Sequence, residues 1–179
     1  MLPIDALMQE HRLIERMIAQ MQKEIVRIRE TNEANGNFVD VVVDFIRSYA
    51  DRCHHGKEEG VLFRELNRKP ISPEIAAMVM ELIKEHVYAR KTTANLAESK
   101  ESYVNGNHDS LEDVVAFMKA LIEFYPQHIE KEDKRFFYSS MECFTSQEQE
   151  AMLNEFWDFD RKIIHEHYAK VLDALERPA

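Results

Sequence analysis

Two stretches of the chain repeat one arrangement of a histidine followed by acidic residues. Residues 54–63 read HHGKEEGVLF and residues 128–137 read HIEKEDKRFF, so both follow the pattern His-x-x-Lys-Glu, then an acidic residue, with Phe at the end. Positions four apart on a helix lie on the same face, so each stretch can present an imidazole and a carboxylate to one point. A point of this kind could hold a metal ion.

A shorter motif precedes each of these stretches. Glu10-His11 lies upstream of His54, and Glu85-His86 lies upstream of His128 at nearly the same distance along the chain. The repeated order of the two motifs indicates a duplicated pair of helices.

Apolar residues recur at helical spacing along almost the whole chain, which predicts an all-α protein. Five helices are expected. The first runs from Asp5, as its N-cap, to about Glu30, and the second from about Phe38 to Leu66. The third begins at Ser72-Pro73, the fourth follows Ser110, and the fifth runs from the capping box Thr145-x-x-Glu148 to about Leu175. Short connections between the first four favour an up-down-up-down four-helix bundle. We expect a single domain over residues 1–179, with the bundle at about 5–140 and an additional C-terminal helix at about 146–176.

Each of the first four helices places one histidine on the apolar stripe that should face the core. These histidines are His11, His54, His86 and His128, and Glu58 and Glu132 follow two of them by one turn. The second helix also carries His55 and Glu59. At roughly 100° per residue His54 lies nearer to the apolar stripe than His55 does, so His54 and Glu58 are preferred, and His55 and Glu59 are the alternative.

Two carboxylates buried in such a core need a counter-charge, because burying them alone costs several kcal/mol. The inner faces offer no obvious Lys or Arg for this purpose, whereas metal ions would supply positive charge. The predicted metal ligands are His11, His54, Glu58, His86, His128 and Glu132. Mixed nitrogen and oxygen ligands with vacant positions favour two non-haem iron ions, with manganese as an alternative and closed structural zinc less suited.

The order His11, His54-x-x-x-Glu58, His86 and His128-x-x-x-Glu132 resembles the hemerythrin-like HHE cation-binding family over about residues 5–140. The resemblance implies a non-haem di-iron centre in the bundle core that binds or reacts with dioxygen, nitric oxide or peroxide. Oxygen-carrying hemerythrins have five histidines and two carboxylates, whereas four histidines are placed here. The set is therefore similar to that of nitrosative-stress di-iron proteins linked to repair of iron–sulfur centres and of peroxide-consuming hemerythrin-like proteins.

Several residues near the predicted ligands are expected to have a structural role or to lie at the surface. Tyr125, one turn before His128, could donate a hydrogen bond to a bound ligand, but a tyrosine at such a position is more often part of the core. Glu10, Glu85, Glu59 and Asp133 are expected on solvated faces rather than behind the ligands. His165 and His167 are expected on the surface or at an interface, and His108 in a loop.

Composition narrows the choice of partners and location. The formal net charge is −10 at pH 7, which disfavours nucleic acid and anionic membrane surfaces as partners. Cys53 and Cys143 are the only cysteines and show no metal-binding spacing. The chain shows no signal-peptide pattern and no apolar run of membrane-spanning length, which predicts a cytoplasmic protein.

The leading hypothesis is a di-iron protein that binds or reacts with a small diatomic molecule or peroxide, in sensing, stress response or an iron-related role. The alternatives are an enzyme that consumes peroxide or nitric oxide and, from a different class, a metal-free helical interaction module. The sequence leaves open whether the chain is an enzyme. The aromatic-rich fifth helix could cover the bundle or form a homodimer contact.

Overall fold

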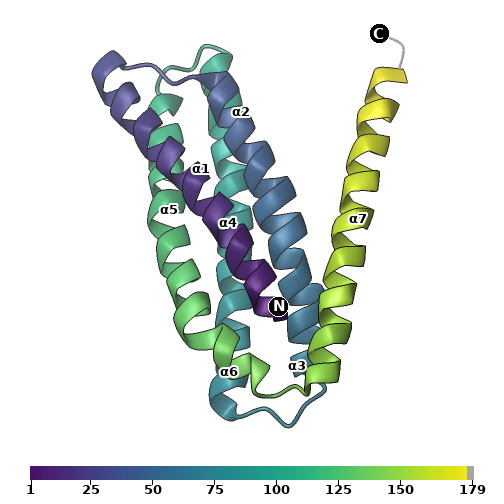
Figure 1. Cartoon of the computed structure of the whole chain (residues 1–179). Helices are drawn as coiled ribbons and strands as arrows, with labels where there is room; N and C mark the ends of the chain where they lie inside the picture. Colours follow the sequence, from purple (N-terminus) through teal and green to yellow (C-terminus); the bar gives the residue numbers. More distant parts are fainter. Residues whose placement is uncertain (177–179) are drawn as a thin grey trace.

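The computed structural model describes the backbone of residues 1–176 and the side chains of residues 1–163. Within these residues the chain is helical with turns and no strand, which confirms the predicted all-α class (Figure 1). None of the described helices combines the length and the apolar character that crossing a lipid bilayer requires.

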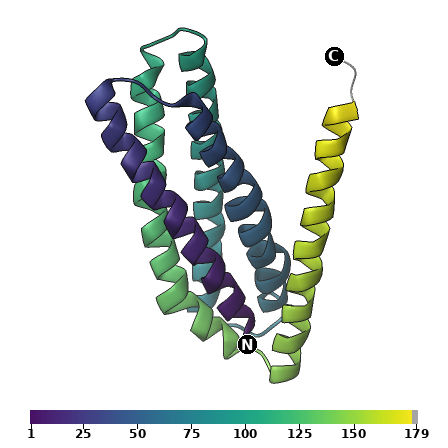
Figure 2. The same cartoon turned by 45° about the horizontal axis from the view of Figure 1, so that its top comes forward.

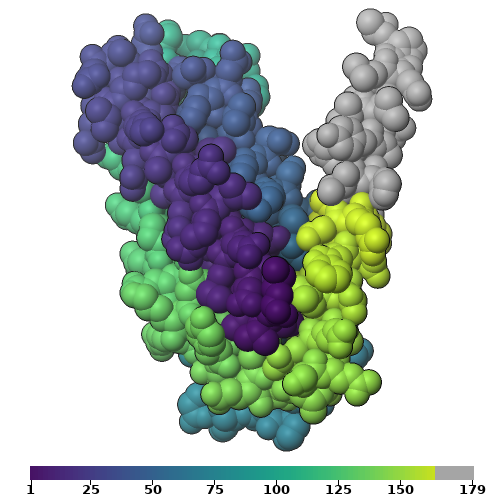
Figure 3. All heavy atoms as spheres, viewed as in Figure 1, coloured from purple at the N-terminus to yellow at the C-terminus, as the bar shows by residue number. Residues whose placement is uncertain are grey.

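Four long helical segments lie side by side, and a further helix packs against them (Figures 1 and 2). The segments are α1 (Pro3–Thr31); α2 (Gly36–Phe45) continued by η1 (Ile46–His55), η2 (Glu58–Phe63) and α3 (Arg64–Leu66); α4 (Pro73–Val104); and α5 (Ser110–Lys131) continued by η3 (Glu132–Phe136) and α6 (Phe137–Met141). The further helix is α7 (Ser146–Glu176). Figure 3 shows the base of α7 against the first turns of α1.

The helix starts follow local capping chemistry. Ser72 accepts a hydrogen bond from the Ile75 amide at 3.3 Å, with Pro73 as the first helical residue. The predicted capping box of α7 is also present, since the Thr145 amide donates to Glu148 at 2.9 Å and the Glu148 amide donates back at 3.3 Å.

The predicted N-cap of the first helix is wrong by three residues, because Leu2 and not Asp5 occupies this position. Proline is well suited to the first turn of a helix, and α1 begins at Pro3. Asp5 therefore lies inside the first turn, where its carboxylate accepts a hydrogen bond from the Leu2 amide at 2.6 Å.

The apolar core consists of two clusters with a polar layer between them. One cluster contains Ile14, Ile18, Leu96, Leu121 and Ile129 among others, and the second contains Leu7, Val61, Leu82 and Phe136 among others. The candidate ligands fall between the two clusters along each segment, as His11 does between Leu7 and Ile14. The fold therefore seals this polar layer with apolar side chains above and below.

Both histidine-rich motifs lie at π-helical segments. Segment η1 ends at His55, η2 begins at Glu58 and η3 begins at Glu132. Hydrogen bonds from residue i to i+5 widen the turn and reduce the rotation per residue, and such segments are frequent at functional sites. A reduced rotation allows His54 and His55 to point into the core together, which the α-helical spacing used for the prediction does not.

Leu96→Ala should lower the free energy of unfolding by about 2–5 kcal/mol, because it leaves a cavity in a packed core. Leu96 is 0 % exposed and lies in the cluster above the polar layer. Leu13→Ala is the control, since Leu13 is 39 % exposed and its truncation should change stability by no more than about 0.5 kcal/mol. Urea denaturation measures both, and equal effects would contradict this core assignment.

Candidate metal centre

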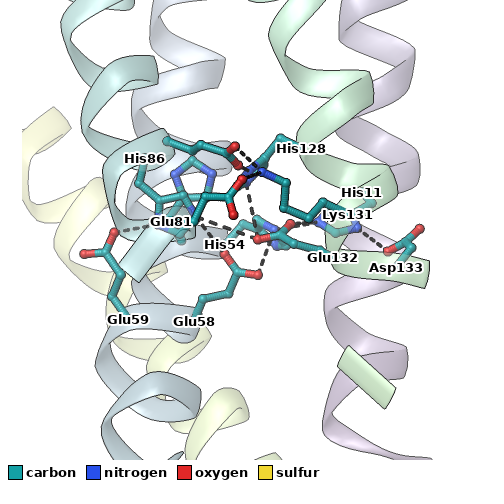
Figure 4. Close-up of polar contacts among 12 residues, drawn as sticks. His11, His54, Glu58, Glu59, Glu81, His86, His128, Lys131, Glu132 and Asp133 are labelled. Atoms are coloured by element: carbon teal, nitrogen blue, oxygen red, sulfur yellow. Dashed lines mark hydrogen bonds and ion pairs between the residues drawn. The ribbon is translucent and has the colours of Figure 1, made fainter. Parts of the chain in front are cut away.

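Five histidines and two glutamates converge in the polar layer between the apolar clusters. They are His11, His54, His55, His86, His128, Glu58 and Glu132, and each is at most 2 % exposed. Figure 4 shows the labelled members of this set turned towards one another from different helices. The structure thus brings together all six ligands predicted from the sequence and adds His55.

The seven side chains form two groups with metal-ligand spacing. His11, His54, Glu58 and Glu132 make up the two-histidine group, in which one ligand atom of each residue lies within 4.8 Å of the others. The same limit defines the three-histidine group of His55, His86 and His128.

Each central carboxylate faces both groups. One oxygen of Glu58 lies 3.7 Å from His54 Nε2 and the other 3.4 Å from His86 Nε2. One oxygen of Glu132 lies 3.1 Å from His11 Nε2 and the other 3.3 Å from His128 Nε2. Carboxylates placed in this way can bridge two ions.

Most of the inward-facing oxygen and nitrogen atoms that could ligate a metal lack hydrogen-bond partners among the described residues. These atoms are both oxygens of Glu58 and Glu132 and the Nε2 atoms of His55, His86 and His128. The exceptions are His11 and His54, whose Nε2 atoms lie 2.9 Å from each other. Buried polar atoms are nearly always paired, so a cluster of unpaired acceptors is a strong indication of bound cations.

The opposite ring nitrogen of every one of these histidines contacts an outer carboxylate. His11 pairs with Asp133 at 2.7 Å, His54 with Glu10 at 3.0 Å, His55 with Asp51 at 3.3 Å, His86 with Glu59 at 2.7 Å and His128 with Glu85 at 2.8 Å, all through Nδ1. A hydrogen bond from Nδ1–H to a carboxylate fixes the tautomer and leaves Nε2 free to bind a metal.

Cationic side chains hold the outer carboxylates in turn. Lys57 pairs with Glu10, Lys131 with Glu85, Arg12 with Asp133, and Arg90 with both Asp51 and Glu59. Charge therefore alternates outward from the centre, from carboxylate and imidazole to outer carboxylate and then to Lys or Arg. Metal sites in proteins are commonly supported by this kind of outer shell.

A model of the hemerythrin HHE cation-binding domain matches residues 2–139. The chain belongs to this family. Searches of curated proteins and of solved structures gave no match. The match covers the helices that supply all seven inward-facing candidate ligands, whereas α7 lies outside it.

The positions shared by the two copies of the repeated motif make equivalent contacts in the structure. The closing Phe137 of the second copy stacks on His11 with ring centres 5.6 Å apart, and Phe63 of the first copy stacks on His86 at 6.0 Å. Each copy of the motif therefore supplies a candidate ligand, a central carboxylate, an outer carboxylate and a ring that packs on a candidate ligand.

The expectation that Glu10, Glu85, Glu59 and Asp133 are merely solvated is wrong. Each of them contacts a histidine on another helix, so its role depends on packing between helices and not on the face of its own helix. The signal in the sequence is the recurrence of an acidic residue at equivalent places in both copies. Side chains of residues 164 and beyond, including His165 and His167, lie outside the described residues.

His55 breaks the symmetry of the duplicated halves. It pairs with Asp51 and stacks on His86 with ring centres 3.9 Å apart. At the equivalent places in the second copy stand Ile129 and Tyr125. The sequence posed His54 and His55 as alternatives, whereas the structure buries both of them, and Glu59 contacts His86 from outside the central cluster.

Without metal, protons partly replace the missing positive charge. Burial disfavours a charged His11, but the hydrogen bond to Asp133 and the negative charge of the nearby Glu132 carboxylate raise its pKa to about 9. Burial and the adjacent Glu132 raise the pKa of Glu58 well above its ordinary value. Burial lowers the pKa of His54 to about 4, so this imidazole is neutral and ready to ligate at neutral pH.

A cavity of about 150 Å³ adjoins the three-histidine group. Its lining includes Asp51, His55, Arg90, Thr93 and Tyr125. The Tyr125 hydroxyl is buried and has no hydrogen-bond partner among the described residues. The cavity has room for a molecule of a few atoms next to the candidate ligands.

Binding of Co²⁺ to the metal-free domain at pH 7 should release protons. His11, with its pKa of about 9, is protonated at this pH and must lose the Nε2 proton to ligate, so affinity should rise as pH increases towards 9. Calorimetric titration in buffers of different ionisation heat measures the release. A binding heat independent of the buffer would contradict the assignment of His11 as a ligand.

Asp51→Asn should weaken the binding of one of two Co²⁺ ions by about 10- to 100-fold, because it removes the carboxylate that orients His55. Asp44→Asn on the same helical segment is the matched control, since Asp44 is exposed and its carboxylate accepts a hydrogen bond from the Ser48 hydroxyl. Competition titration with a chelator measures both variants, and a loss in the control equal to that in Asp51→Asn would rule out this role.

Proposed function

We propose that this hemerythrin domain is a non-haem di-iron protein that binds or reacts with dioxygen, nitric oxide or peroxide, in sensing, stress response or an iron-related role. His11 and His54 would hold one ion, and His55, His86 and His128 the second. Glu58 and Glu132 would bridge the two ions. The observation that carries the proposal is the set of buried, inward-facing donors that lack partners and are shared between two groups.

The chemistry of the donors supports iron. The seven inward-facing residues offer nitrogen and carboxylate oxygen without a thiolate, a set suited to iron and manganese, while closed structural zinc sites take four ligands in a tetrahedron. Bound iron would supply an open coordination position and one-electron redox chemistry. Manganese is the second candidate and zinc the third.

The residues of this chain would place and tune the ions. The five Nδ1–carboxylate contacts hold the imidazoles in fixed orientations, and the apolar clusters on either side exclude water from the centre. The two groups contain different numbers of histidines, so the two ions would have different ligand sets, and the cavity lined by His55 adjoins the three-histidine group.

His55 changes the comparison with the oxygen carriers. The four histidines predicted from the sequence set the chain apart from these proteins, but with His55 the buried set contains five histidines and two carboxylates. Reversible binding of dioxygen is thus a candidate function beside turnover of peroxide or nitric oxide. The cavity beside His55 and the hydroxyl of Tyr125 support access of a small polar molecule.

We also propose an up-down-up-down arrangement of the four long segments, which their short connections support. The net charge of −10 supports a function that needs neither nucleic acid nor an anionic membrane surface. A cytoplasmic location and a homodimer remain part of the proposal.

Protein purified without air should contain about two irons per chain, one for each group of ligands, and should gain ligand-to-metal absorption bands on exposure to oxygen. His55→Ala should reduce the iron content towards one, because it removes a ligand from the three-histidine group. His108→Ala is the control, since His108 is exposed in a turn. Elemental analysis and optical spectra measure all three proteins.

Full iron content in His55→Ala would contradict the role of His55. Absence of any metal from the wild-type protein, with unchanged stability in His54→Ala, would instead support a metal-free interaction module. Added peroxide separates the remaining functions: rapid evolution of oxygen indicates turnover, whereas bands that disappear when oxygen is removed indicate reversible binding.

A further inference from the structure

Helix α7 lies outside the family match but packs directly on the segment that carries His54 and His55. Phe159 of α7 covers Gly56, where an added Cβ would lie 2.8 Å from the Phe159 ring. The Phe156 ring of the same helix lies 5.8 Å from Lys57 Nζ. The absence of a side chain at Gly56 therefore allows α7 to approach the metal centre closely.

Asp160 of α7 contacts Lys57, which pairs with the carboxylate that supports His54. The Asp160 carboxylate lies 2.8 Å from Lys57 Nζ and accepts a hydrogen bond from the Cys53 thiol at 3.2 Å. Lys57 also pairs with Glu10, which contacts His54 Nδ1 at 3.0 Å. A continuous path of side-chain contacts thus joins α7 to a predicted ligand.

The second half of the domain provides an internal comparison. Lys131 pairs with Glu85, which contacts His128, but the other carboxylate on Lys131 is Glu81 of α4. The Lys131 side chain is 16 % exposed and Glu81 is 57 % exposed, whereas the Lys57 side chain is 1 % exposed. The lysine is therefore partly exposed in one half and fully buried against α7 in the other.

We propose that α7 is a working part of the metal centre and that Asp160 is a positioning residue for His54, acting through Lys57 and Glu10. Asp160 satisfies part of the Lys57 charge, so Glu10 remains a strong acceptor for His54 Nδ1–H and keeps the imidazole oriented and basic. Without Asp160, the Lys57 ammonium would pair with the Glu10 carboxylate alone, and Glu10 would accept less strongly from His54. The Lys57 side chain is only 1 % exposed, although Asp160 is 37 % exposed, so water would compensate only part of the lost ion pair.

This inference rests on the proposed function, but part of its test does not need metal. Asp160→Asn should weaken one of the two Co²⁺ binding steps by about 3- to 10-fold, less than the roughly 10- to 100-fold typical when the direct partner of a ligand is changed. It should also shift the His54 ring resonances in NMR spectra of the metal-free protein. Glu81→Gln is the matched control and should change Co²⁺ affinity by less than about twofold, because exposed ion pairs contribute little.

A second pair of variants moves α7 without removing a charge. Gly56→Ala places a methyl group against Phe159 and should reproduce the direction of the Asp160→Asn effects. Gly60→Ala is its control, since an added Cβ there would meet Phe159 at 3.9 Å, an ordinary contact distance. Both should leave the affinity of the other Co²⁺ step unchanged.

The outcomes separate the two proposals. If Asp160→Asn and Glu81→Gln give equal Co²⁺ affinities and unshifted His54 resonances, the role of Asp160 is wrong while the metal centre stands. If no variant and no wild-type protein binds Co²⁺, the proposed function fails, and the His54 resonances of the metal-free protein still decide whether Asp160 positions this ring.

Discussion

The burial of two carboxylates at the centre of a helical bundle is the constraint on which the remaining structure depends. Glu58 and Glu132 are fully buried, and their ion-pairing neighbours in the described structure are imidazoles rather than Lys or Arg. Isolated charges of this kind cost too much free energy to persist without compensation. The cationic side chains stand one layer further out, where they neutralise the carboxylates that orient the histidines. This leaves a central deficit of positive charge that two cations would fill.

Duplication explains how so many polar groups meet in one layer. Within each half, a lysine of the long motif holds the glutamate that supports the histidine of the same motif, as Lys57 and Glu10 do for His54. Between halves, the acidic residue after each central glutamate supports a histidine of the other half, as Asp133 does for His11. The site is therefore complete only when the two halves pack together, which couples folding of the domain to assembly of the centre.

The sequence predicts the helical class and the six ligands His11, His54, Glu58, His86, His128 and Glu132 as candidates, because residue type and spacing within single helices carry that information. His55 could not be assigned in this way, since its direction depends on π-helical turns that the usual helical period does not describe. The outer carboxylates were missed because their partners lie on other helices. The contact of Asp160 with Lys57 depends on how α7 docks, which no local pattern records. The directions and partners of these residues therefore depend on turn geometry and on packing between helices, which the periodicity of the sequence does not describe.

The position of bound iron tests the central claim most directly. Anomalous diffraction at the iron absorption edge, from crystals of the iron-loaded protein, locates the ions without assuming their ligands. The account predicts two peaks, one beside His11 and His54 and the other among His55, His86 and His128, with Glu58 and Glu132 between them. A single peak, or peaks away from these residues, would contradict it.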